Sequence, residues 1–311
     1  MKLEDISTTK SEIKQARELI KVHKDFGLVL SGPFEHFGAA VDFYLSHLQK
    51  QVNFSTSIKG APIQTDLDNI LHFQRLRQNH KYITDDLGNI LTILLRMNWM
   101  KNSVRMGTCP NNLWREFTSL DVHFFFVEFR SIFDYIAQLI AEIADSPKET
   151  KNWGKSFHGL SKKVSPKNPN YEANEKKLGT KQTELVRKGK WHSEIKEVRE
   201  NLTHRGSEAI IFGSAEDPIL FQLYSGPPHA AVNVPPMFMW DGKSIIDFEL
   251  FSSYYLAKLL LFLEEFGDYL YSKVPISKPF DKISKSSVSA HGGLPTLVMY
   301  LDKLSKRLKG T

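Results

Sequence analysis

Two residues in the second half of the chain, Arg199 and His204, carry side chains that together could cleave RNA without a metal ion. Histidine, with an ordinary pKa of about 6.5, can take a proton from a ribose 2′-hydroxyl or give one to a leaving oxygen. Arginine stays charged, binds phosphate in a bidentate manner and stabilises the charge that grows in the transition state. Such cleavage requires a 2′-hydroxyl in the substrate and leaves a 2′,3′-cyclic phosphate.

The pair belongs to residues 193–206, a segment that predicts one short helix. Ser193 can cap its start, apolar residues repeat at helical spacing, and Gly206 can close its end. His204 lies in the last turn, where the helix dipole favours the charged imidazolium and therefore a role as an acid. The simpler interpretation is that His204 and Arg205 are only cations that stabilise a helix end.

Helix geometry separates the two side chains. Residues five apart differ by about 7.5 Å along the axis and by about 140° around it, so Arg199 and His204 of one chain do not face one phosphate. A symmetric homodimer would bring two arginines and two histidines around a single cleft. The spacing alone is weak evidence, because Arg75 and His80 repeat it on another predicted helix, and either pair fits a solvated helix face.

The elements that must position the pair are helices. Four patterns with apolar residues at helical spacing predict them: residues 65–104, 114–144, 193–206 and 245–271. The second pattern is apolar almost all round, which is typical of the central helix of a bundle. The sequence therefore predicts a mainly α fold, an up-and-down helical bundle over residues 65–272.

Three further parts are predicted around this bundle. Residues 1–60 read as an N-terminal helical hairpin, and residues 273–311 read as a C-terminal tail with a short helix. A small antiparallel β insert is expected within residues 207–244, before the last core helix. Its strands are expected at three short apolar runs, residues 209–212, 219–224 and 237–240.

Charge is concentrated in one segment. The net charge is +6 and the pI is about 9.1, and residues 148–190 hold twelve Lys or Arg against four Glu. Because Gly and Pro interrupt this segment, we expect a long excursion with one short helix. It could follow an RNA backbone and stack bases, or simply be solvated. The candidate RNA-binding residues are Lys155, Lys162, Lys163, Lys188, Lys190, Trp191 and Arg205.

The single cysteine, Cys109, excludes an intrachain disulfide and a Cys-based zinc site, which fits a reducing compartment. The N-terminus does not read as a signal peptide, and no apolar run reaches the length of a membrane span. We therefore expect a cytoplasmic protein without a membrane partner. No metal or cofactor motif is present, so neither a metal nor a cofactor is predicted.

The long helices, the Arg-x4-His pair near the end of the third and the basic excursion before it resemble the HEPN family of ribonucleases. The resemblance covers about residues 65–272, and the F-R-S-I-F-D-Y stretch of residues 129–135 is also similar to members of that family. It implies a four-helix core, pairing of two protomers and RNA cleavage without a metal. It also implies a setting in toxin or anti-phage defence, with an antitoxin or regulatory protein as a partner.

Carried over to this chain, the resemblance makes Arg199 and His204 the catalytic pair. Family members often have Asn, Asp or His directly after the arginine, whereas here Glu200 follows it and Asn201 comes next. On the second core helix, Arg130 and Asp134 lie four residues apart on one face. They form either a local ion pair or a support in which Asp134 holds Arg199 or His204.

Three functions remain open on this evidence. The first is a metal-independent endoribonuclease that acts on RNA as a homodimer. The second is a non-catalytic HEPN-like module that holds RNA or a protein partner through the same cleft, which the carboxylate of Glu200 favours. The third is a purely structural helical protein, in which the pair would point away from any interface.

Overall fold

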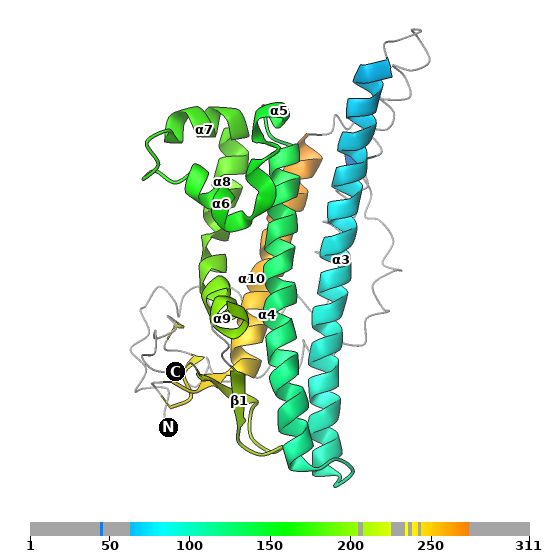
Figure 1. The fold of residues 1–311 in the computed structure, drawn as a ribbon, viewed down its shortest axis with the longest axis vertical. Coiled ribbons are helices and arrows are strands. Elements are labelled where there is room, and N and C mark those ends of the chain that lie inside the picture. The colour runs from blue at the N-terminus through cyan, green and yellow to red at the C-terminus, as the bar shows by residue number, and fades with distance from the viewer. Residues whose placement is uncertain are drawn as a thin grey trace.

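The computed structural model describes residues 44–45, 63–204, 208–224, 234–235, 238–241 and 244–273 (Figure 1). These residues form mainly helices with one small antiparallel sheet, which confirms the predicted fold class. The predicted N-terminal hairpin and C-terminal tail lie outside the described residues, apart from residues 44–45 and 273.

Four long helices form the core: α3 (Ile63–Arg105), α4 (Asn111–Glu142), α9 (His192–His204) and α10 (Phe248–Ser272). Ring contacts of Phe133 with His192 in α9 and with Phe262 in α10 show that α4 packs against both of these helices (Figure 1). Phe126 also meets Phe248, at the start of α10, so α10 runs parallel to α4. The core is therefore an up-and-down arrangement, as predicted, because α3 and α9 both run antiparallel to α4.

Side-chain pairs fix how α3 lies along α4. Arg75 Nε donates to Glu142 Oε1 at 2.6 Å, and Arg96 Nε donates to Asp121 Oδ2 at 3.2 Å. Between these two levels, Asn89 Nδ2 donates to Glu128 Oε2 at 3.3 Å. Each step forward in α3 is matched by an equal step back in α4, so the two helices keep one antiparallel register over this length.

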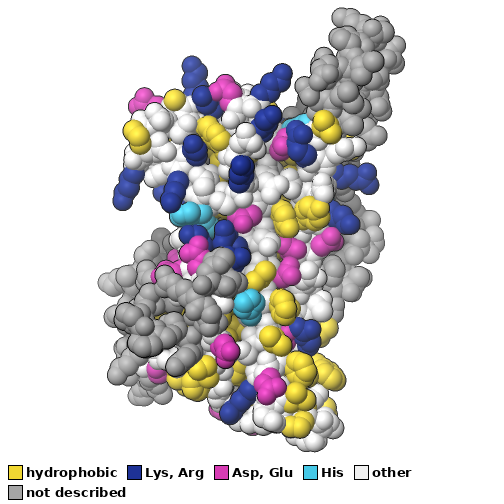
Figure 2. All heavy atoms as spheres, in the orientation of Figure 1, with side chains coloured by type: hydrophobic (Ala, Val, Ile, Leu, Met, Phe, Trp, Pro, Cys, Tyr) yellow, Lys and Arg dark blue, Asp and Glu magenta, His cyan; other side chains and the backbone are white. Residues whose placement is uncertain are grey.

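Residues 147–191 form a helical head, which the sequence analysis described wrongly as an excursion with one short helix. It contains α5 (Pro147–Thr150), η2 (Trp153–Lys155), α6 (Phe157–Lys163), α7 (Tyr171–Leu178), α8 (Thr180–Lys188) and η3 (Gly189–Trp191). Figure 2 shows Lys and Arg side chains spread over this head.

The Gly, Pro and Ser residues of the head separate its helices rather than preventing them. Pro147 begins α5, and the Ser156 hydroxyl caps α6 by accepting from the Gly159 N–H at 3.1 Å. Gly179 joins α7 to α8 at φ 101°, a backbone conformation that favours glycine. Gly154 lies directly on α4, since a Cβ there would come within 2.7 Å of the Gln138 Cα.

The sheet is formed by β1 (Glu208–Phe212), β2 (Leu220–Tyr224) and β3 (Ile246–Asp247), in the order β1-β2-β3 with antiparallel pairing. The first two strands lie where the sequence predicts them. The third prediction, at residues 237–240, is wrong, because there Met239 contributes only an isolated bridge to Ile246.

The last core helix also begins later than predicted, at Phe248 instead of Ile245. Asp247 explains the shift, because its Oδ1 accepts from the Leu250 N–H at 3.0 Å and so caps the helix start. The two residues before Phe248 are thereby left extended and pair with β2.

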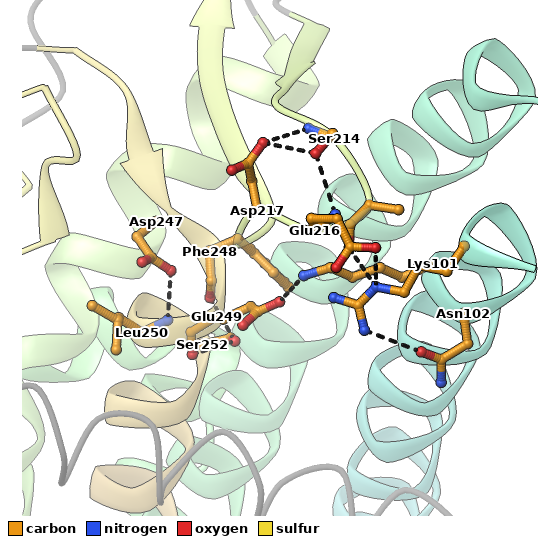
Figure 3. A network of polar contacts seen from close by, with 12 residues as sticks. Lys101, Asn102, Ser214, Glu216, Asp217, Asp247, Phe248, Glu249, Leu250 and Ser252 are labelled. Atoms are coloured by element: carbon orange, nitrogen blue, oxygen red, sulfur yellow. Dashed lines mark hydrogen bonds and ion pairs between the residues drawn. The ribbon is translucent and has the colours of Figure 1, made fainter.

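A buried ion pair connects α3 to the start of α10 (Figure 3). Lys101 Nζ lies 2.8 Å from Glu249 Oε1, and the two side chains are 5% and 4% exposed. Close by, Arg105 Nε donates to the Ala215 carbonyl at 2.9 Å and lies 3.4 Å from Glu216 Oε1. This network fastens the turn between β1 and β2 to the end of α3.

The described helices and the single cysteine bear on predictions made from composition. No helix in the described part of the chain is both long and apolar enough to cross a membrane. Cys109 is half-buried in the turn that connects α3 to α4.

Candidate functional site

The predicted Arg-His helix is α9, and one face of it packs into the core. Ile195, Val198 and Leu202 are buried, as expected from their spacing. The predicted cap is wrong, because the helix already begins at His192 and the Ser193 hydroxyl donates to the Lys190 carbonyl at 2.9 Å. The short helix η3 runs directly into α9 and takes the place of a capped start.

Arg199 lies near a histidine of α4 that the sequence analysis did not select. Burial of His123, together with the positive charge of Arg199, lowers the pKa of this imidazole below its ordinary value. Both side chains are half-buried. His204 ends α9, but its side chain and Arg205 lie outside what the structure describes.

Arg130 and Asp134 lie further along α4 and form the local ion pair, with 3.4 Å between Arg130 Nε and Asp134 Oδ2. Asp134 Oδ1 also accepts from the Phe157 N–H at 3.0 Å, at the start of α6. Asp134 therefore anchors the head to α4, and the local pair is the interpretation that the structure shows.

Glu200, the residue that departs from the family pattern, pairs with Lys196 one turn earlier, at 3.0 Å. Burial alone would raise the pKa of Glu200, but the hydrogen bond and charge of Lys196 outweigh it and lower that pKa. Asn201 points elsewhere, since it is buried and its side-chain amide donates to the Glu197 carbonyl at 2.9 Å.

His158, in the first turn of α6, is a second half-buried histidine. Burial and the charges of Lys196 and Lys162 lower the pKa of His158, which favours the uncharged ring. Two groups of polar side chains follow one another along α9, where it packs beside α4 and α6, and together they are called the seam strip below. Electrostatic interactions join His158, Arg130, Lys196 and Glu200 in the first group, and His123 and Arg199 in the second. Figure 2 shows Lys and Arg side chains gathered with histidines between the head and the lower half of the molecule.

The basic residues of the head have different surroundings. Lys155, Lys162, Lys163 and Lys190 are exposed, whereas the ammonium of Lys188 lies 3.2 Å from Glu265 and 3.6 Å from Glu184. Figure 2 shows several Lys and Arg side chains on the surface of the head.

The ring of Trp191, predicted as a platform for a base, is partly buried and packs against the core. This ring lies 5.1 Å from Phe133 and 5.8 Å from Tyr255, measured between centroids. The Lys258 ammonium lies over the same ring at 5.2 Å. These contacts engage the indole within the protein, so exposed lysines are the head's stronger candidates for RNA contact.

Arg75, the arginine of the other Arg-x4-His pair, belongs to a group of side chains that joins two helices. Arg75 and His72 both bind Glu142, and His72 Nδ1 lies 2.8 Å from Glu142 Oε2. This group joins α3 to the end of α4, away from the seam strip.

The buried imidazole of His192 should make the stability of the protein depend on pH. Its Nδ1 lies 3.1 Å from the Gly189 carbonyl, and burial lowers its pKa from 6.5 to about 4. The unfolded chain therefore binds a proton in this window that the folded chain does not. We expect stability to fall as the pH drops from 6.5 to 4, by about 3 kcal/mol more in the wild type than in His192→Gln. Urea unfolding followed by circular dichroism across this range measures the difference.

Asp86 is a control, because its pKa shift should change stability with pH in the opposite direction to that of His192. Burial, then the hydrogen bond and charge of Glu128, raise the pKa of Asp86 from 3.8 to about 7. This carboxyl keeps its proton in the folded state, so its contribution falls as the pH rises through the same window. Asp86→Asn should therefore be more stable than the wild type at pH 7, by about 1 kcal/mol after allowance for solvent screening.

The prediction for His192 has its own contradicting outcome. If the free energy of unfolding of the wild type and of His192→Gln changes with pH in parallel, the pKa shift assigned to His192 is wrong.

Comparison with models of protein families, with curated proteins and with solved structures finds no match to this chain. Within the described residues, no three His, Cys, Asp or Glu side chains are grouped so that they could hold a metal ion. The seam strip is thus the feature on which a function can be argued.

Proposed function

We propose that the protein is a metal-independent endoribonuclease that binds RNA along the seam strip and leaves 2′,3′-cyclic phosphate ends. The observation that carries the proposal is that two half-buried histidines, His123 and His158, lie among cations of α4 and α9, where burial and those charges lower the pKa of each ring. Cations attract the phosphate, and a neutral imidazole can accept the proton of a 2′-hydroxyl. The Arg-x4-His resemblance to HEPN ribonucleases leads to the same reaction.

Each step of the reaction has a residue to perform it. The guanidinium of Arg199 holds the non-bridging oxygens of the phosphate and stabilises their growing charge. His123 takes the proton of the 2′-hydroxyl, whose oxygen then attacks the phosphorus. The bond to the 5′-oxygen breaks, and His204 of a second copy, at the end of its α9 where the helix dipole favours the imidazolium, protonates that oxygen. The products are a 2′,3′-cyclic phosphate and a 5′-hydroxyl.

The head supplies a surface beyond the reacting phosphate. His158 belongs to α6, which also carries the exposed Lys162 and Lys163, so the cations of the head continue from the seam strip. Contacts of this type follow a nucleic-acid backbone without reading its sequence, and they weaken as salt rises. We therefore propose that the head guides single-stranded RNA to the seam strip.

One observation favours a second candidate, a module that binds RNA or a protein without cleaving. Glu200 is 41% exposed and its lowered pKa keeps it negative, so a carboxylate lies within the strip. A fixed negative charge repels the phosphate of the transition state, on which negative charge has grown, more strongly than it repels the phosphates of a loosely bound RNA backbone.

Cleavage of an RNA pool in EDTA by the purified protein tests the proposal. We expect RNA to be cut to cyclic phosphate ends, while DNA of the same sequence stays intact because it lacks the 2′-hydroxyl. Arg199→Ala, His204→Ala and His123→Gln should each slow cleavage by about 100-fold or more. Arg77→Ala, at an exposed position of α3, is the matched control and should cleave at the wild-type rate.

The same variants separate the two candidates. If the wild type does not cleave but binds RNA more tightly than Arg199→Ala, the protein is a binding module. If the wild type and a variant with both Arg199→Ala and His204→Ala agree in both cleavage and binding, Arg199 and His204 only stabilise a helix end. Circular dichroism of every variant must first show unchanged helix content.

A further inference from the structure

One face of the molecule, formed by α3, α4 and the turn between them, exposes large apolar side chains. Seven residues define this apolar face, with exposed fractions from 38% to 69%: Leu95, Trp99, Met106, Leu113, Phe117, Leu120 and Phe124. Figure 2 shows hydrophobic side chains gathered over the lower ends of α3 and α4. Isolated exposed apolar residues are ordinary, but a cluster of this kind requires an explanation.

Along α4 the exposed residues follow one line. Leu113, Phe117, Leu120 and Phe124 are spaced by four, three and four residues, so they fall within about 60° around the helix. The inward sides of α4 are already filled, for example by Phe125, which has no exposed surface. The line is therefore a second apolar side of the helix, separate from the one that faces the core.

The row on α3 lies beside the row on α4. Because Arg96 is bonded to Asp121, its neighbours Leu95 and Trp99 are at the level of Leu120 and Phe117 in the antiparallel register. The charge of Arg96, between the two rows, is neutralised by the buried Asp121. The two rows thus form a continuous surface with no unpaired charge at its centre.

The size of the face matches a protein interface. From the ordinary surface areas of these side chains, the seven residues expose on the order of 700 Å². Monomeric proteins seldom expose a contiguous apolar patch of this size, and a stable complex buries about 800 Å² on each partner.

We infer that the apolar face binds a second copy of this chain in a two-fold symmetric dimer. The alternation of four and three residues is the spacing at which one helix packs against another. A second copy supplies an α4 with the same spacing and the same length, and an isologous contact needs a surface that is complementary to itself. A flat apolar surface without a central charge meets that requirement.

This dimer differs from the one that helix geometry alone suggests, in which the ends of α9 meet. Here the copies meet through α4, and His123 directly precedes Phe124 of the apolar face. Consecutive residues of a helix point about 100° apart, so the seam strip lies on a different side of α4 from the contact. The inference does not depend on the proposed reaction, because it rests on exposure and spacing alone.

Light scattering coupled to size-exclusion chromatography of the full chain, from about 1 to 100 µM, tests the inference. We expect a mass of twice 35.7 kDa for the wild type. Phe117→Glu with Leu120→Glu places charges at the centre of the face and should raise the dissociation constant by about 100-fold or more. Both positions are exposed in one copy, so the fold should persist, and thermal melting with circular dichroism checks this.

Leu71→Glu is the matched control, because Leu71 is 47% exposed on α3 but lies near its other end. It should dimerise like the wild type. A wild type that stays monomeric at every concentration would overturn the inference, since a different partner would then cover the face. Equal dimerisation of the wild type and the double variant would overturn it as well. A wild type that dimerises but does not cleave RNA would count only against the proposed reaction.

Discussion

Lys101→Met is expected to lower the free energy of unfolding by about 3–5 kcal/mol, the usual effect of removing one partner from a buried ion pair. Glu249 would keep its charge at a position that is 4% exposed, 2.8 Å from where the ammonium had been. The loss should exceed that of any surface substitution, because water cannot replace the missing partner. Urea unfolding monitored by circular dichroism measures it.

Two further variants show whether burial is the cause. Lys101→Met combined with Glu249→Leu removes both charges, and most of the lost stability should return, since apolar replacements of a buried pair are often neutral. Lys81→Met breaks only the exposed Lys81–Asp85 pair, at 4.0 Å, and should change stability by less than about 0.5 kcal/mol. A double variant as unstable as Lys101→Met would show that the charge of Glu249 is not what destabilises the single variant.

Phe133→Ala should destabilise the protein by about 3–5 kcal/mol, because it opens a cavity where several elements meet. The Phe133 ring has no more than 1% of its surface exposed, and its centroid lies 4.9 Å from Phe157, 5.1 Å from Trp191 and 5.9 Å from Phe262. These partners come from α6, η3 and α10. Loss of the ring should therefore also loosen the head.

Phe133→Leu is the control, since it keeps most of the volume and should lose only about 1 kcal/mol. Thermal melting and urea unfolding rank the two variants. Hydrogen exchange adds a local measure, because the amides of α6 should exchange faster in Phe133→Ala than in Phe133→Leu. An alanine variant within about 1 kcal/mol of the wild type would contradict the central place of this ring.

The long helices could be predicted because their signal repeats over many turns. In α4 the buried residues Phe129, Ile132, Phe133 and Ile136 recur at helical spacing, and the same pattern continues for most of the helix. An error of a few residues at either end of such a helix does not change which face it buries. The helical bundle could therefore be predicted from the sequence alone.

The short elements could not be predicted, because tertiary contacts decide them. The helix α6 spans seven residues and is held by Ser156 at its start and by Asp134 of α4. Short isolated helices are marginal, so local sequence gives little signal for them. The strand β3 has two residues and exists through its pairing with β2, while Asp247 stops α10 from starting earlier.

The candidate site shows the same limit. Arg199 follows from a motif, but His123 comes near Arg199, and His158 near Lys196 and Glu200, only through the packing of α4 and α6 on α9. One signal was present, since His123, Arg130 and Asp134 recur at intervals of seven and four residues and so share a helix face. The role of Trp191 as a platform for a base stays a prediction, although its ring is only partly exposed because it packs against the core beside Phe133.

The position of Cys109 gives the molecule a natural attachment point for spectroscopy. It is the only thiol in the sequence and lies in the turn just before Leu113, at the tip of the α3–α4 pair. A maleimide dye or a nitroxide would therefore be incorporated once per chain, without any engineered cysteine. Energy transfer or dipolar coupling between two such labels would report the distance between chains directly.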